Sequence, residues 1–247
     1  MIAKTSQEME MLKKAGRICA ELLRSIKSLI RPGINTKELD IFAEKFINEK
    51  GAKPAFKGYR GYPATICVSI NEEIVHGIPH DNKKIKEGDL VSIDVGVNFQ
   101  GFYADAAKSF GVGKIKKVLK KLLKVTYQAL LLGIKKAKAG NYVGDISSAI
   151  QNFVEKNGFN VIREYTGHGI GRNLHEAPQI PNFGREREGE RLEEGMVLAI
   201  EPMVAAGSYE VIVLDDGWTA ITKDRLPAAH FEHTVLVTKK GGYILTK

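Results

Sequence analysis

The sequence predicts an α+β fold in which a curved antiparallel sheet, built from two similar halves, carries pairs of helices on its outer face. The first observation is a repeat: Glu87–Asp94 (EGDLVSID) returns as Glu194–Glu201 (EGMVLAIE), 107 residues later. The same offset aligns Gly33–Gly51 with Gly140–Gly158 without a gap. Helical and strand patterns also follow one another in the same order in both copies. A duplicated fold of this kind places its halves about a pseudo-twofold axis.

In the first half, residues 6–30 have apolar residues at helical spacing, and Pro32-Gly33 ends that helix. Thr36 is expected to cap a second helix that ends at Gly51. Three strands are expected next, at 64–70, 90–97 and 103–112. The last two form a hairpin across residues 98–101.

The second half repeats this plan with helices at about 115–137 and 143–157. Strands are expected after them at about 160–166, 196–204, 209–214 and 230–237. No linker or low-complexity segment interrupts the chain. We therefore expect one catalytic domain, 1–247, with pseudo-symmetric halves of about 1–112 and 113–247, and a functional site on the open face of the sheet.

The composition, with 43% hydrophobic and 27% charged residues, is that of an ordinary globular domain. The N-terminal residues are charged throughout, so no signal peptide is expected, and no apolar run approaches the ~20 residues that cross a bilayer. Only Cys19 and Cys67 are present, far apart, which indicates a reducing compartment, the cytoplasm. Dinucleotide-binding, phosphate-loop and serine-hydrolase motifs are missing.

The net charge of +8 is concentrated in the stretch Lys114–Lys138. Read as a helix, this stretch places leucines on one side and lysines on the others, which favours a solvated amphipathic helix. The alternative is a contact surface for a polyanion such as ribosomal RNA. Aromatic residues do not interleave with the lysines as they would on a base-stacking surface.

Four acidic residues stand at corresponding places in the two halves. Asp94 interrupts an apolar strand, and Asp105 follows eleven residues later on the neighbouring strand of the hairpin. Glu201 ends the second copy of that strand, and Glu232 follows 31 residues later. Taken singly, Asp94 could begin a turn and Glu232 could face solvent. Together, carboxylates that converge on one axis repel one another and are costly to bury, and a multivalent cation removes both problems.

Three histidines complete the set. His168 lies between glycines in TGHGIG, where small neighbours permit close approach of backbone or substrate. His76 (HGIP) and His175 (HEAP) form a second repeated pair, each ahead of the acid-tipped strand of its half. A lone histidine of this kind is more often a surface residue. Beside four carboxylates, one nitrogen suits Co, Mn, Fe or Zn in a paired site, and two bridged ions are typical of hydrolysis.

At this point the chain resembles the type I methionine aminopeptidases along its whole length. The segments that carry the resemblance are CVSINEEIVHGIP, IDVG with DA eleven residues on, GHGIGRNLHEAP, LAIEPM and FEHTVLV. The family's metal ligands, in order, fall on Asp94, Asp105, His168, Glu201 and Glu232. Its two substrate-contacting histidines fall on His76 and His175.

The resemblance implies the pita-bread fold, two divalent ions, and removal of N-terminal methionine from nascent proteins whose second residue is small and uncharged. It implies Glu201 as the proton acceptor, with His76 and His175 as catalytic donors. The methionine pocket is similar to the set Tyr59, Tyr62, Cys67 and Trp218. One departure is Leu174, where many relatives carry an aromatic residue. The length matches the short bacterial form, which is expected to be monomeric.

Two alternatives remain open from the sequence. An X-Pro aminopeptidase of the same fold is the nearest enzymatic alternative, although the prolidases and creatinases of this fold carry an additional N-terminal domain. A non-catalytic pita-bread module could bind peptides or the ribosome, although such modules typically lose metal ligands and none is missing here.

Overall fold

The computed structural model describes residues 1–247. Its four α-helices are α1 (Ser6–Ile26), α2 (Thr36–Glu49), α3 (Lys117–Lys136) and α4 (Val143–Lys156), and two short 3-10 turns are η1 (Lys27–Leu29) and η2 (Tyr59–Gly61). The strands of the first half are β1 (Lys53–Pro54), β2 (Ile66–Ile70), β3 (Glu73–Val75), β4 (Leu90–Phe99) and β5 (Phe102–Gly111). Those of the second half are β6 (Asn160–Val161), β7 (Thr166–Gly169), β8 (Glu176–Pro181), β9 (Val197–Ile200), β10 (Met203–Ala205), β11 (Val211–Val213), β12 (Ala220–Thr222), β13 (Ala228–His230), β14 (His233–Thr238) and β15 (Gly241–Ile244).

The starts of the first two helices follow from their capping residues. Thr5 accepts a hydrogen bond from the Glu8 amide at the start of α1 and forms a capping box with that glutamate. The expected cap of α2, Thr36, is wrong. Asn35 caps α2 instead, because its side chain accepts from the Glu38 amide while the Thr36 hydroxyl hydrogen-bonds the His80 main chain.

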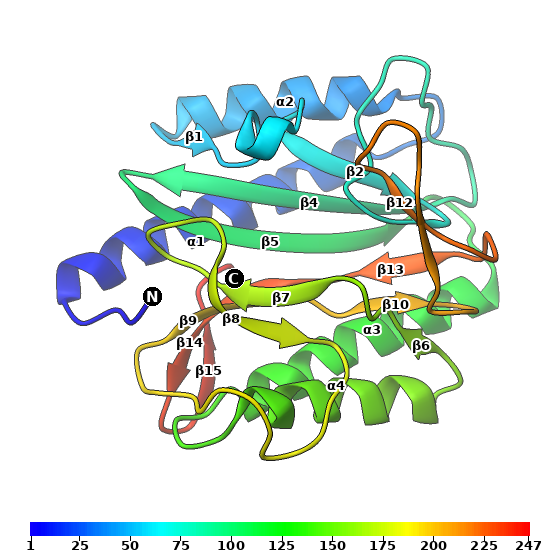
Figure 1. The fold of residues 1–247 in the computed structure, drawn as a ribbon. Helices are drawn as coiled ribbons and strands as arrows, with labels where there is room; N and C mark the ends of the chain where they lie inside the picture. Colours follow the sequence, from blue (N-terminus) through cyan, green and yellow to red (C-terminus); the bar gives the residue numbers. More distant parts are fainter.

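The strands pair antiparallel in four hydrogen-bonded groups that lie side by side (Figure 1). The two larger groups are β1-β4-β2 with β5 beside β4, and β15-β14-β9-β7-β8. The smaller ones are β13-β10-β6 and β11-β12-β3. In the last, a strand of the first half pairs with the second, which joins the halves at one end of the molecule.

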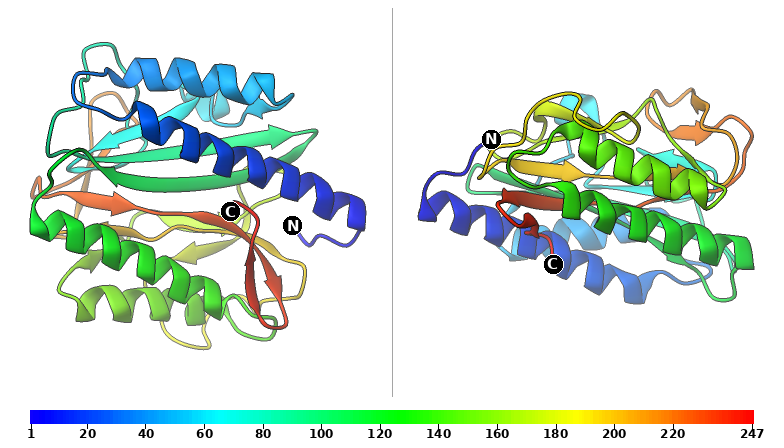
Figure 2. Two further views of the ribbon diagram at one scale, coloured as in Figure 1. Left: turned by 180° about the vertical axis from the view of Figure 1, so that it is seen from behind. Right: turned by 90° about the horizontal axis from the view of Figure 1, so that it is seen from below.

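The helices cover one face of this strand layer. Seen from behind, α1 and α3 lie across the strands, while α2 and α4 flank them on the outside (Figure 2). Helix α1 contacts β4 and β5, and α3 contacts α4 and β15. The prediction of an α+β architecture with two helix pairs on the outer face is therefore confirmed.

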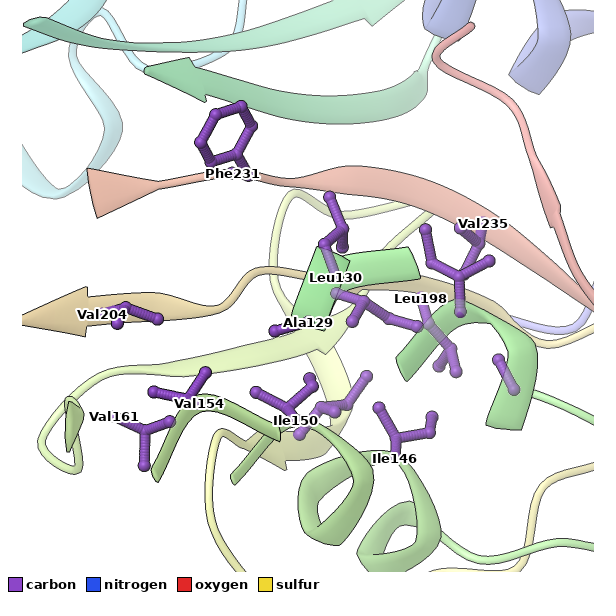
Figure 3. Packing of buried hydrophobic residues seen from close by; sticks show 14 of the residues in the cluster. Ala129, Leu130, Ile146, Ile150, Val154, Val161, Leu198, Val204, Phe231 and Val235 are labelled. Atoms are coloured by element: carbon purple, nitrogen blue, oxygen red, sulfur yellow. The ribbon is translucent and has the colours of Figure 1, made fainter. Parts of the chain in front are cut away.

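Each half has a large apolar cluster of its own. In the second half, α3 and α4 pack through Ala129, Leu130, Ile146 and Ile150, and strands β9, β10 and β14 add residues such as Val235 (Figure 3). In the first half, the corresponding cluster joins α1 and α2 to β2, β4 and β5. Burial of these apolar faces stabilises the packing of the helices on the strands by about 25 cal/mol per Å². Because all four helices pack on one face of the strand layer, its other face is left open.

Several expected strands of the second half are interrupted. The stretch 160–166 contains β6 and then a loop, with β7 beginning only at Thr166. The strands expected at 196–204 and 230–237 are each broken in two, at Glu201-Pro202 and at Phe231-Glu232. Proline has no amide hydrogen for a ladder bond, which explains the first break. Strands β1, β3, β8, β12 and β15 were not predicted.

The halves meet along the middle of the layer, where β5 runs beside residues 230–234. Only one contact is an ordinary backbone bond, from the Glu232 amide to the Ala107 oxygen. Beside this bond, a hydroxyl replaces the backbone ladder. Thr234 Oγ1 accepts from the Asp105 amide at 2.8 Å and donates to the Asp105 backbone oxygen at 2.7 Å. We call this contact the seam. It fixes the register of two strands that carry acidic side chains.

Candidate metal centre and substrate cavity

A cavity of about 380 Å³ opens on the face of the strand layer that the helices leave free. Its volume is within the range of small-molecule sites. One end is acidic and the walls are aromatic and apolar. Twenty residues line it, and they include every site residue predicted from the sequence: Tyr59, Tyr62, Cys67, His76, Asp94, Asp105, His168, His175, Glu201, Trp218 and Glu232.

The β4–β5 hairpin supplies the two aspartates. Asp94 pairs with Ala107, and Asp105 pairs with Gly96. The two acids are therefore diagonal neighbours on adjacent strands and do not stand directly opposite each other. Both side chains lie on the same face of the hairpin, because Asp94 is two residues from Gly96, the partner of Asp105, and side chains alternate between faces along a strand. Their carboxyl groups interact, and each helps to set the pKa of the other.

The second half supplies two glutamates at its strand breaks. Glu201 lies between β9 and Pro202, and Glu232 lies between β13 and β14. The sheet ladder resumes at once, because His233 pairs with Ile200. Each glutamate thus leaves a strand at the point where regular pairing stops, and its side chain turns into the cavity.

The acidic end of the cavity forms a compact cluster. One ligand atom each from Asp105, His168 and Glu232 lies within 4.8 Å of the others, and all three residues are buried. Burial raises the pKa of Asp94 to about 6, and burial beside other carboxylates raises the pKa of Asp105 and Glu232. Burial also raises the pKa of Glu201. These carboxyl groups are therefore hard to ionise as long as nothing positive stands among them.

The donor set fits a divalent cation. Three buried carboxylate oxygens, Asp94 Oδ1, Asp105 Oδ1 and Glu232 Oε1, have no hydrogen-bond partner. A buried polar atom without a partner costs about 1–3 kcal/mol, and a bound ion would satisfy all three. Carboxylate oxygens with one imidazole nitrogen are suitable ligands for Mn, Fe, Co or Zn. Structural zinc sites, by contrast, are typically rich in sulfur ligands.

His168 is oriented as a metal ligand requires. Its Nδ1 lies 2.9 Å from the Gly169 oxygen, so Nδ1–H donates and the Nε2 lone pair faces the acids. Burial lowers the pKa of His168 to about 3, which keeps the ring neutral. The glycines beside it are required, because a Cβ at Gly167 would lie 2.5 Å from the Ala199 oxygen and one at Gly169 would lie 2.1 Å from the Ala177 oxygen.

His175 lies beside His168, with ring centroids 4.2 Å apart. Its Nδ1 is 2.9 Å from the Tyr59 hydroxyl, which can donate to it and leave the proton on Nε2. Burial, and to a lesser degree the charge of Arg60, lowers the pKa of His175. A neutral imidazole with its N–H free toward the cavity is a hydrogen-bond donor.

His76 follows β3 directly and has φ of 59°, a left-handed conformation that is uncommon for a residue other than glycine. Its ring makes edge contacts with Tyr165 and Trp218. Burial lowers the pKa of His76 to about 4, so this ring is neutral as well. Backbone strain at such a place often accompanies function.

The apolar wall is built by residues from both halves. Tyr62 and Trp218 meet edge to face with ring centroids 5.1 Å apart. Cys67 lies in β2 directly opposite Asp94 on β4, which connects this wall to the acidic end. Leu174, the departure from the family pattern, is buried and also lines the cavity.

Sequence reasoning missed several residues of the site. Phe56, Tyr165 and Met203 line the cavity but were not singled out, although Met203 ends the LAIEPM segment. His230 was also missed: it is 2% exposed, and its Nε2 lies 3.4 Å from Glu201 Oε2. His230 stands two residues before Glu232 within the strand expected at 230–237, and the strand period that puts both on one side was the signal that could have found it.

The lysine-rich stretch Lys114–Lys138 lies away from this cavity. It contains α3, in which Leu119, Leu122 and Leu130 are buried, Leu131 and Leu132 are exposed, and the lysines face solvent. At its C-terminal end, lysines from separate segments line one groove beside α4: Lys135, Lys136, Lys138, Lys156 and Lys240. None of the helices is both long enough and apolar enough to cross a bilayer.

The chain is similar to known proteins over its whole length. Residues 10–239 match metallopeptidase family M24. Methionine aminopeptidase 1 of Bacillus subtilis is 51% identical over 247 residues, which are 100% of this chain and 99% of that protein. The methionine aminopeptidase of Clostridium perfringens is 50% identical over 246 residues, which are 100% of this chain and 98% of that protein.

Solved structures give the same result. The methionine aminopeptidase of Thermotoga maritima superposes with a TM-score of 0.98 at 50% identity, and each chain is covered completely. The prolidase of Pyrococcus furiosus superposes with a TM-score of 0.82 at 26% identity, and this chain covers 65% of it. The fold is shared by both groups, whereas the length and the higher identity are those of the aminopeptidases.

Proposed function

The chain belongs to metallopeptidase family M24, and we propose that it is a type I methionine aminopeptidase of the short bacterial form, which removes the N-terminal methionine of new proteins by metal-assisted hydrolysis. The observation that carries this function is the group of buried carboxylate oxygens without partners, at the end of a cavity with an aromatic wall. Nothing in a structural core requires such a group.

The finer proposal is that two divalent ions bind, held by Asp94, Asp105, His168, Glu201 and Glu232. Four carboxylates supply enough oxygens for two ions, and His168 supplies a nitrogen through Nε2. When bound, such ions polarise the scissile carbonyl and activate water. Their identity, among Co, Mn, Fe and Zn, is not fixed by this donor set.

The protein's own residues would handle the proton and the substrate. Glu201 would accept the proton of the attacking water at a carboxylate oxygen, since its side chain lines the cavity at the acidic end. His175 would donate from Nε2 to the developing oxyanion, with the Tyr59 hydroxyl fixing Nδ1. His76 would donate to the scissile nitrogen side.

The methionine side chain would bind against Tyr62, Cys67 and Trp218, with Tyr59 at the edge. An unbranched thioether packs well on aromatic rings and adapts to an irregular wall. We propose that the second residue must be small and uncharged because it lies beside the acidic cluster. The rest of the substrate would extend from the open mouth of the cavity, so that any nascent N-terminus can enter.

The decisive experiment is a peptide assay with metal-stripped protein. After addition of Mn²⁺ or Co²⁺, a Met-Gly- peptide should be cleaved, a Met-Leu- peptide should be resistant, and an Ala-Pro- peptide should be spared. Cleavage of Ala-Pro- alone would indicate an X-Pro aminopeptidase. Cleavage of none, with binding of Met-Gly-, would indicate a non-catalytic module, and full activity in EDTA would exclude a metal mechanism.

We also propose that residues 1–247 form one catalytic domain, with pseudo-symmetric halves 1–112 and 113–247, that acts as a monomer in the cytoplasm. The predicted metal ligands and the two substrate-contacting histidines all line one cavity of this chain. Both cysteines, Cys19 and Cys67, are free and buried, as suits a reducing compartment.

A contact with the ribosome is a further part of this proposal. The groove of five lysines beside α4 gathers positive charge from α3, α4 and the C-terminal hairpin, and such surfaces bind RNA phosphates. Replacement of Lys135, Lys136 and Lys138 by Glu should weaken co-sedimentation with ribosomes and flatten its salt dependence, with peptide cleavage unchanged. Replacement of Lys117, Lys120 and Lys124 tests the other end of α3. Unchanged co-sedimentation in both variants would leave a solvated helix face.

A further inference from the structure

His230 lies behind the acidic cluster rather than on the cavity wall. It ends β13, is 2% exposed, and does not line the cavity. Its Nε2 atom is buried without a hydrogen-bond partner, although it lies 3.4 Å from Glu201 Oε2. A buried nitrogen without a hydrogen-bond partner costs free energy. The nearby Glu201 carboxylate is the group with which it can pair.

One hydroxyl holds both the backbone amide and the backbone oxygen of His230. Ser109 Oγ accepts from the His230 amide at 2.9 Å and donates to the His230 oxygen at 2.8 Å. Ser109 Oγ in turn lies 2.7 Å from Ser92 Oγ on β4. On the other edge of β13, His230 pairs with Met203. The ring is therefore presented to Glu201 by a backbone held at the seam and at the adjacent sheet.

Glu201 lies between two imidazoles, one at each oxygen. Its Oε1 is 3.5 Å from His168 Nε2, and its Oε2 is 3.4 Å from His230 Nε2. The group of ligand atoms within 4.8 Å of one another includes His168 but not His230. Asn182 Nδ2 donates to the backbone oxygen of Glu201 and not to its carboxylate. His168 thus faces the ion site and His230 faces the outer oxygen of Glu201.

We infer that His230 is a positioning residue whose Nε2–H donates to Glu201 Oε2 and so directs the other oxygen toward the metal and the attacking water. This inference rests on the proposed function. A carboxylate ligand held by a donor on its outer oxygen loses less rotational freedom when the ion binds, and such outer partners are typically worth 10–100-fold in metal affinity or activity.

The test compares two variants of similar side-chain length. H230Q keeps an amide N–H near the position of Nε2, and H230M removes the donor. In calorimetric titration of metal-stripped protein with Mn²⁺, H230M should bind about 10–100-fold more weakly than wild type, and H230Q should stay close to wild type. H80Q, made at an exposed histidine that does not line the cavity, is the control for histidine replacement. Thermal unfolding of the metal-free proteins checks that each variant folds.

Wild-type affinity in H230M would overturn the inference, and so would an H230Q variant as weak as H230M, because packing rather than the donor would then matter. If H230M does not fold, H230N replaces it, since its shorter amide stops short of Glu201. A wild-type protein that binds no Mn²⁺ would fail the proposed function itself, which separates the two outcomes.

Discussion

The two halves supply their acids through hairpins of different build. In the first half, β4 and β5 pair without a break over ten residues each, and Asp94 and Asp105 project from a continuous ladder. In the second half, the strands break at Glu201 and Glu232, and a long connection between them carries the β11–β12 hairpin. That connection places Trp218 on the cavity wall. A carboxylate therefore needs only a rigid strand, whereas the substrate wall required additional chain in one copy.

This comparison predicts that the acids of both halves matter equally, despite their different supports. D94N in the first half and E232Q in the second should each lower kcat/KM for a Met-Gly- peptide by at least about 10³-fold, because a metal contributes several kcal/mol to the reaction. Thermal unfolding should show that both variants fold. Loss in one variant only would mean that the halves do not share one metal site.

Residues outside the repeat should separate into different roles. H175A should lower kcat by about 10²–10³-fold, the usual effect of removing an oxyanion donor, while its Mn²⁺ affinity changes little. H168A should weaken Mn²⁺ binding directly. Steady-state kinetics and calorimetry on both variants decide this, and a larger loss of affinity in H175A would reverse the assignment.

The long connection of the second half should act on substrate binding alone. W218A removes an aromatic wall whose edge contact with Tyr62 spans 5.1 Å between centroids. Loss of one large apolar contact of 1–3 kcal/mol corresponds to about 10–200-fold, and we expect it in KM for Met-Gly- peptides. Mn²⁺ affinity should equal that of wild type. A loss of metal affinity in W218A would show that the connection also supports the acids.

The smallest effect expected is on stability in the absence of metal. Burial raises the pKa of Asp94 from its ordinary value of 3.8 to about 6. A raised carboxyl pKa contributes stability that is present below pH 3.8 and lost as the pH rises through about 6. The metal-free protein should therefore lose several degrees of Tm between about pH 4 and 6, at about 2–4 °C per kcal/mol. Differential scanning calorimetry should show that Mn²⁺ restores Tm at pH 7 and that D94N reduces the fall. A metal-free Tm that rises over this range would contradict the shift.

The sequence was sufficient for the parts of the fold that are long and periodic. The four helices and the β4–β5 hairpin have apolar spacing that extends over several turns or strand repeats. The acids could be located because the repeat of Glu87–Asp94 at Glu194–Glu201 marks positions where an acid replaces an apolar residue.

The remainder depends on contacts that no local pattern contains. Strand β3 is three residues long and is paired by β12 of the other half. The diagonal placement of Asp94 and Asp105 follows from the register of a two-residue turn at Gln100-Gly101 rather than from their spacing. His230 acquires its position from Ser109, 121 residues away in sequence.

The seam has a consequence for the order in which the protein assembles. Its contacts join residues 121 and 129 positions apart, and long-range pairing of this kind closes late because loop-closure entropy opposes it. The acids of the two halves would therefore meet late in folding, when their mutual repulsion also appears. An ion that binds after this step cannot speed folding but does slow unfolding. The lifetime of the folded protein against proteolysis would then follow the supply of metal in the cell.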